Sequence, residues 1–171
     1  MRIKVLIGCF TGIFWISSAA HAAATEASPP VLVATKRLSL DSALKLAQAA
    51  IGKCRREGVQ VAVTVVDRSG HVQVVLRDVL AMDLALVVSR DKAYTAVSFN
   101  SSTSALEGRF NGAYAVPKEP GILIAGGGLP IQAGGQLVGG VGVSGAPSGT
   151  TDEACAKAGV QAIQSDLDMA D

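Results

Sequence analysis

Histidine and tyrosine are scarce in this sequence, with two of each. Of the two histidines, His21 lies in a segment that we expect to be removed, which leaves His71. His71 follows a tight turn and is either an ordinary turn histidine or a ligand or base. Tyr94 and Tyr114 either fill the core or stack on a planar ligand. These three residues are the candidates for contact with such a ligand.

Sequence motifs of several enzyme classes are absent. The chain contains no G-x-S-x-G, H-E-x-x-H or C-x-x-C, so hydrolase, zinc protease and thiol redox chemistry lack support. A histidine-rich metal site is excluded in the same way. Residues 140–145 match G-x-G-x-x-G, but they lie inside an expected strand instead of between a strand and a helix. We therefore reject a dinucleotide-binding fold.

A group of basic residues and glycine amides offers a place for an anion. The basic residues Arg77, Arg90 and Lys92 flank an expected helix together with acidic residues, and a solvated charged face is the default interpretation of this group. If that face borders a pocket, Lys92 and Thr95, about one turn apart, could bind a carboxylate with Arg77 as a bidentate partner. The amides of Gly127 and Gly128 could hold the same group.

The expected strand at 137–143 is nearly bare on one face. Gly140 and Gly142 point to that face, while Val141 and Val143 point to the other. Glycines inside a strand mark the close approach of a helix, another backbone or a ligand. We favour tight helix packing over a ligand surface.

Two cysteines remain in the expected mature chain. Cys54 lies on the apolar face of the first expected helix, and Cys155 lies near the start of the last one. An oxidising compartment would permit a disulfide between them, whereas two buried thiols are the alternative. The sequence leaves both open.

Composition limits the class of protein. The 171 residues are 49% apolar, with 15 Lys and Arg against 14 Asp and Glu. This length and apolar content predict one folded domain, and the absence of a basic run in its body argues against nucleic acid as a partner.

The N-terminus has the pattern of a secretory signal. Arg2 and Lys4 precede the apolar stretch 5–16, and residues 20–22 form an A-x-A cleavage site. We expect a signal peptide at 1–22, a linker at 23–37, a domain at 38–171 and a periplasmic or extracellular protein. The apolar stretch is shorter than the ~20 residues of a spanning helix, so we expect no stable membrane insertion.

The periodicity of apolar residues predicts an α+β fold. Helices are expected at 40–57, 81–99 and 151–167, the first capped by Ser39 and the last by Thr151. A hairpin at 59–66 and 71–77 is expected near the sheet centre, and about three strands between 122 and 143. The result is an antiparallel sheet of about five strands flanked by helices. Residues 107–121 form an irregular loop that could act as a lid.

Four segments together resemble one known family. These are V-V-D-R-x-G at 65–70, K-A-x-T-A at 92–96, G-G-x-P-I at 127–131, and the glycine-rich strand 139–145 followed by Asp152 and Glu153. Their order and spacing resemble those of the GlcG/HbpS haem-binding family from about Leu38 to Ala162. The C-terminal domain of the PduO adenosyltransferase is related to this family.

The resemblance implies a profilin-like domain that assembles into dimers or higher oligomers and, in some members, binds haem. The first helix lacks histidine, so the candidates for an iron ligand are His71, Tyr94, Tyr114, Thr103 and Met82. Weak binding of haem at the surface is the alternative.

We therefore expect an exported, non-catalytic haem-binding protein. Apolar surface would hold the tetrapyrrole ring, and Arg77, Lys92 or glycine amides would hold its carboxylates. The alternatives are an enzyme or accessory factor acting on a small organic acid at Lys92, Thr95 and Arg77, and an oligomeric scaffold.

Overall fold

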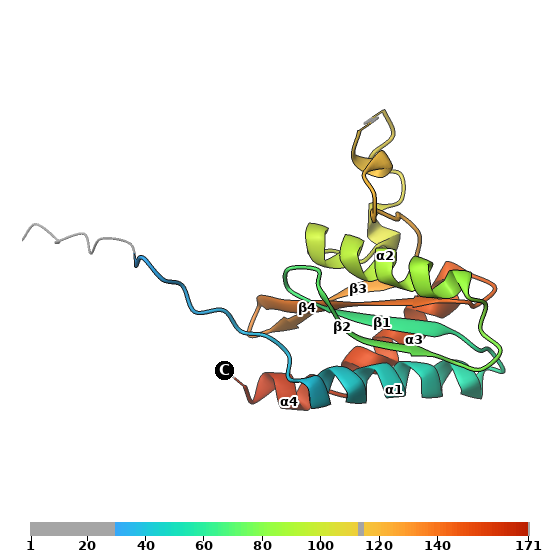
Figure 1. Cartoon of the computed structure of the whole chain (residues 1–171), viewed down its shortest axis with the longest axis horizontal. Helices are drawn as coiled ribbons and strands as arrows, with labels where there is room; N and C mark the ends of the chain where they lie inside the picture. The colour runs from blue at the N-terminus through green and yellow to red at the C-terminus, as the bar shows by residue number, and fades with distance from the viewer. Residues whose placement is uncertain (1–29, 113–114, 171) are drawn as a thin grey trace, which may run out of the picture. The chain divides into compact units, whose positions relative to one another are not determined.

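The computed structural model describes residues 30–112 and 115–170 and confirms the α+β class (Figure 1). The helices are α1 (Leu40–Arg56), α2 (Leu84–Phe99), α3 (Gly149–Gln161) and α4 (Gln164–Asp168), and the strands are β1 (Ala62–Asp67), β2 (Val72–Arg77), β3 (Gly128–Ala133) and β4 (Gln136–Ser144). Short 3-10 turns, η1 (Ser104–Leu106) and η2 (Val116–Lys118), lie between α2 and β3. The chain from Thr35 onward is one compact unit. The expected signal peptide lies outside the described residues.

The sheet has four antiparallel strands in the order β2-β1-β4-β3. All six residues of β1 are buried, as expected for a central strand. The expectation that the whole hairpin is central is wrong for β2, which is an edge strand with Val72 and Val75 exposed. The strand expected at 122–124 is not formed, because Thr95 Oγ1 accepts the Leu123 amide at 2.7 Å and holds this segment against α2.

Helices cover both faces of the sheet. Figure 1 shows α1 and α3 on one side and α2 on the other. The main core lies on the side of α1 and α3 and includes the fully buried Leu46, Ile131, Val141 and Val143. There the structure joins Cys54 of α1 to Cys155 of α3 in a disulfide. None of the helices within the described ranges is long and apolar enough to cross a membrane.

The bare face of β4 packs directly on α2, which confirms the packing interpretation. A Cβ atom at Gly142 would overlap the backbone of Ser89 and Ala93, and one at Gly140 would lie 2.9 Å from the Ala93 carbonyl oxygen. Helix α2 therefore sits closer to the sheet than any side chain on this face of β4 would allow.

Helix ends follow local capping rules. Ser39 Oγ accepts the Ser42 amide at the start of α1, and Gly58, just beyond its end, has a positive φ of 75°. The last helix differs from expectation. Ser148, and not Thr151, is its N-cap, and the helix ends at Gln161 before the short α4.

Candidate functional site

A cavity of about 380 Å³ lies between the β1–β2 turn and α2. We call it the histidine pocket, and its lining includes Gly70, His71, Val72, Arg90, Tyr94 and Gly121. Two of the three aromatic side chains selected from the sequence, His71 and Tyr94, thus meet in one place. The third, Tyr114, lies outside the described residues.

His71 presents its ring to solvent with an acidic residue behind it. The side chain is 81% exposed, and Nδ1 lies 3.6 Å from the Asp67 carboxylate. Burial raises the pKa of Asp67, but the amides of His71 and Ser69, together with Arg37 and the His71 ring, bring it below its ordinary value. Asp67 is therefore ionised at neutral pH, and its carboxylate lies on the Nδ1 side of the exposed imidazole ring.

Tyr94 lies against backbone on two sides. A Cβ atom at Gly70 would come within 2.6 Å of its ring, and one at Gly121 within 3.4 Å. Because Gly121 ends the loop that begins at Glu107, the tyrosine couples this loop to the hairpin turn. About one turn before Tyr94 on α2, Arg90 Nη2 donates to Asp91 Oδ1 at 2.9 Å.

Lys92 is buried, which corrects the expectation of an open basic face. Its ammonium group donates to Asp152 Oδ2 at 2.7 Å and to the Val143 carbonyl oxygen at 3.1 Å. A Cβ atom at Gly127 would lie 2.9 Å from the lysine nitrogen, and one at Gly128 would overlap the Lys92 backbone. The protein's own atoms thus fill the space between Lys92 and these glycines.

Burial raises the pKa of the Asp152 carboxyl above its ordinary value, and the contacts with Lys92 and the Ala146 amide oppose this rise. The carboxylate also joins two segments, because Oδ1 accepts the Ala146 amide at 3.0 Å. Lys92 and Asp152 therefore connect α2 to the start of α3 inside the protein.

The other residues selected from the sequence lie apart. Thr95 holds the 121–123 segment, and buried Thr103 accepts the Gly128 amide at 2.8 Å. Arg77 lies on the edge strand and donates to the Ala81 carbonyl oxygen at 2.6 Å, while Met82 is exposed. The structure does not bring Arg77, Lys92 and the glycines together around a cavity.

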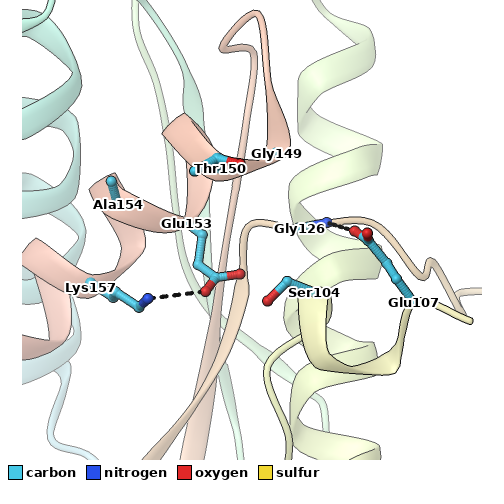
Figure 2. Close-up of a pocket in the computed structure, with 8 residues that line it drawn as sticks. All are labelled: Ser104, Glu107, Gly126, Gly149, Thr150, Glu153, Ala154 and Lys157. Atoms are coloured by element: carbon cyan, nitrogen blue, oxygen red, sulfur yellow. Dashed lines mark hydrogen bonds and ion pairs between the residues drawn. The ribbon is translucent and has the colours of Figure 1, made fainter. Parts of the chain in front are cut away.

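A second cavity, of about 530 Å³, was not expected from the sequence. We call it the glutamate pocket, and its lining includes Ser104, Glu107, Gly126, Thr150, Glu153 and Lys157 (Figure 2). In the sequence, Glu153 stands out only as part of the family motif, and no local pattern marks Glu107. Within the described ranges, no three or more His, Cys, Asp or Glu residues gather to hold a metal ion.

Comparisons with known proteins agree with this architecture. The family model described as "Haem degrading protein HbpS-like" matches residues 38–161. A protein of Citrobacter freundii, described as an uncharacterized 15.0 kDa protein in the dhaT-dhaS intergenic region, is 35% identical over an alignment of 117 residues that covers 63% of this chain and 80% of that protein.

Three solved structures share the fold. An HbpS double mutant of Streptomyces reticuli is 41% identical with a TM-score of 0.74, covering 82% of this chain and 97% of that one. The ORFY protein of Klebsiella pneumoniae is 26% identical with a TM-score of 0.76, covering 81% and 98%. A PduOC:haem complex is 28% identical with a TM-score of 0.70, covering 74% and 95%.

Proposed function

Because the chain belongs to the HbpS-like family, we propose that it binds haem at the histidine pocket. The observation that carries the proposal is the exposed His71 ring beside the ionised Asp67. Since the porphyrin ring would itself hold the iron, a single protein side chain, His71, would be enough as the ligand supplied by this chain. Among the solved relatives, the PduOC structure is described as a haem complex.

The lining of the pocket fits the remaining parts of haem. Val72, Pro120 and the Tyr94 ring provide apolar and aromatic surface for the tetrapyrrole. Arg90 carries the guanidinium group of the lining and takes the place of Arg77 and Lys92 as the partner of a propionate, which would share this group with the Asp91 carboxylate that Nε and Nη2 already contact. Bound haem would add a redox-active iron at His71. Asp67 would orient the imidazole towards it, as carboxylates commonly orient histidine ligands.

A haem titration followed at the Soret band tests the proposal. Micromolar protein should shift the band, and His71→Ala should weaken binding by at least about tenfold. Arg68→Ala is the matched control, because Arg68 belongs to the same turn and is not part of the pocket lining. Tyr94→Phe and Tyr114→Phe test the two tyrosines as ligands. No band shift, or equal haem affinity in wild type and His71→Ala, would refute the assignment.

We propose a binding role without catalysis, and the same experiment tests it. The matched family model is described as haem-degrading, so the spectrum should be followed over hours with a reductant and oxygen present. A stable Soret band supports a carrier or store. Its decay, with free iron appearing at the same rate, would identify a degrading enzyme instead.

We also propose that the protein acts after export. The charged and apolar N-terminal pattern supports this, and so does a disulfide, which persists mainly in oxidising compartments. Cell fractionation followed by N-terminal sequencing should find a chain that begins near Ala23 outside the cytoplasm. A full-length cytoplasmic protein would contradict this proposal.

Self-association is the last part of the proposal. Edge strand β2 presents unpaired backbone groups, and Val75, Val79 and Leu80 on and after it are exposed. We expect a homodimer or higher oligomer that pairs through this edge. Light scattering should give a multiple of the monomer mass, and Val75→Lys should reduce it. A monomer at micromolar concentration would refute this part alone.

A further inference from the structure

The two asparagines of this chain differ in the residue that follows each of them. Asn111 precedes Gly112 in the loop between η1 and η2, and Asn100 precedes Ser101 at the end of α2. Asparagine is a chemically labile residue, because the backbone nitrogen of the next residue can attack its side-chain amide. A following glycine favours this attack, since it has no Cβ atom beside the attacking nitrogen. The chain therefore contains a reactive dipeptide and a less reactive one for comparison.

The fold leaves both reacting groups of Asn111 and Gly112 free. Both residues are exposed and lie outside any helix or strand, in a loop that Figure 1 shows projecting beyond α2. Within residues 30–112 and 115–170, the Gly112 amide donates no hydrogen bond and the Asn111 side chain forms none. The Asn111 main-chain amide donates to the Gly108 carbonyl oxygen at 3.5 Å, a bond that involves neither reacting atom. A Cβ atom at Gly112 would meet nothing within 4 Å, so the space beside this residue is open.

The fold holds the corresponding groups of Asn100 apart. The Ser101 amide donates to the Ala96 carbonyl oxygen at 3.2 Å and so caps the end of α2. Gln132 Nε2 donates to Asn100 Oδ1 at 2.8 Å, which ties the side chain to β3. The amide would have to leave the helix, and the side chain would have to turn away from Gln132, before the two could meet. Folding therefore protects Asn100 and leaves Asn111 open to attack.

We propose that Asn111 deamidates spontaneously in the folded protein, with water as the co-reactant. The Gly112 nitrogen gives up its proton to water and bonds to Asn111 Cγ, and the Cγ–Nδ2 bond breaks. Nδ2 takes up a proton from water and leaves as ammonia, so a cyclic imide remains. Water then opens the ring at either carbonyl carbon, which yields aspartate or its β-linked isomer. No group is oxidised or reduced in these steps.

Either product adds a carboxylate to a loop that reaches the histidine pocket. The loop ends at Gly121, where a Cβ atom would lie 3.4 Å from the Tyr94 ring. The β-linked isomer also lengthens the main chain by one carbon atom, so it alters the path of the loop as well as its charge. Because the nitrogen attacks in its deprotonated form, the reaction accelerates as pH rises. It needs no bound ligand and so does not depend on whether the histidine pocket binds haem.

Peptide mapping of the full chain tests the proposal. The folded protein is kept at neutral and at alkaline pH for several weeks, and samples are digested briefly with trypsin, with a sample at time zero to correct for the digestion. The mass of peptide 110–118 should show exchange of NH2 for OH, more rapidly at alkaline pH, in two products of which one co-elutes with the peptide from Asn111→Asp. Peptide 93–109, which contains Asn100, should keep its amide. The proposal is overturned if peptide 110–118 stays unchanged, or if peptide 93–109 is converted as fast.

Variants of the loop identify the reacting groups. Asn111→Ser should abolish the conversion of peptide 110–118, and Gly112→Ala should slow it, because a Cβ atom then crowds the attacking nitrogen. Gly108→Ala is the matched control and should leave the rate unchanged, since Gly108 has a positive φ of 77° in the same loop but does not follow an asparagine. Unfolding in guanidinium with a reductant should open Asn100 to conversion. Equal rates in Gly112→Ala and wild type would refute attack by the Gly112 nitrogen. An equal rate for Asn100 in the folded and the unfolded chain would refute its protection by the fold.

Discussion

Breaking the Lys92–Asp152 pair gives the sharpest test of how this fold is held together. Both side chains are 4% exposed, and their charged atoms lie 2.7 Å apart. Lys92→Met leaves a buried carboxylate without its cation, a change that costs about 3–5 kcal/mol in proteins. Asp152→Asn should also destabilise the fold, although the amide oxygen can still accept the Ala146 N–H group.

The double variant separates the pair from the two single changes. In Lys92→Met/Asp152→Asn no charge is left buried, so its cost should fall below the sum of the single costs by about 0.5–3 kcal/mol. Urea unfolding followed by circular dichroism at the helix band gives all the free energies. The exposed pair Lys45–Asp166 is the control, because its distance is similar, 2.8 Å, but Lys45→Met should cost under about 1 kcal/mol.

The loss in Lys92→Met should also depend on pH. Without the lysine, the pKa of Asp152 rises further, because burial is then opposed by the Ala146 amide alone. A raised folded-state pKa favours folding at low pH and loses that effect as pH rises, so the variant should approach wild type in acid. The stabilising role of this pair would be refuted if Lys92→Met lowered the free energy of unfolding by less than about 1 kcal/mol and the double variant showed no coupling to Asp152. Lys92 would then again be a candidate for ligand binding.

Three further predictions follow from other contacts. Replacing Cys54 and Cys155 by serine opens a link between residues 101 positions apart, so stability should fall by up to about 4.7 kcal/mol in urea, and reducing agent should then have no further effect. The bidentate contact with Arg55 lowers the pKa of Asp78 against the effect of burial, so this carboxylate stabilises the fold above its unfolded pKa of about 3.9, and that stability should be lost as pH falls below it, but not in Asp78→Asn. Gly142→Ala should cost at least about 2 kcal/mol because its Cβ would overlap α2 backbone, whereas Gly52→Ala, which meets nothing closer than 3.6 Å, should not destabilise.

Local sequence patterns predicted a helix, strand or turn well where the residues of that segment alone determine its structure. Ser39 and Gly58 delimit α1, and the turn after Asp67 joins two antiparallel strands. The glycines of β4 predicted close helix packing, because a strand face without side chains needs a partner at short distance. The prediction of a strand at 122–124 was wrong. Its apolar residues are typical of a strand, but the contact that holds this segment comes from Thr95, 28 residues away in sequence.

The candidate site was predicted in part. His71 and Tyr94 were selected by residue type, and the structure brings both to one pocket. Arg90 was seen only as part of a charged face, since nothing local shows that this helix position lies beside the hairpin turn. Glu107 and Glu153 lie in different parts of the chain and face one cavity only after η1 and α3 are brought together.

The sequence by itself determined the class of fold, the family and the few side chains capable of chemistry, because these depend on short patterns and residue types. Only the tertiary structure decided which charges are buried. Lys92 has the spacing of a surface residue, but β4 lets α2 approach so closely that the lysine reaches Asp152, 60 residues further along the chain. Whether two residues so far apart in sequence form an ion pair depends on how the helices and strands pack. The local periodicity of apolar residues does not predict it.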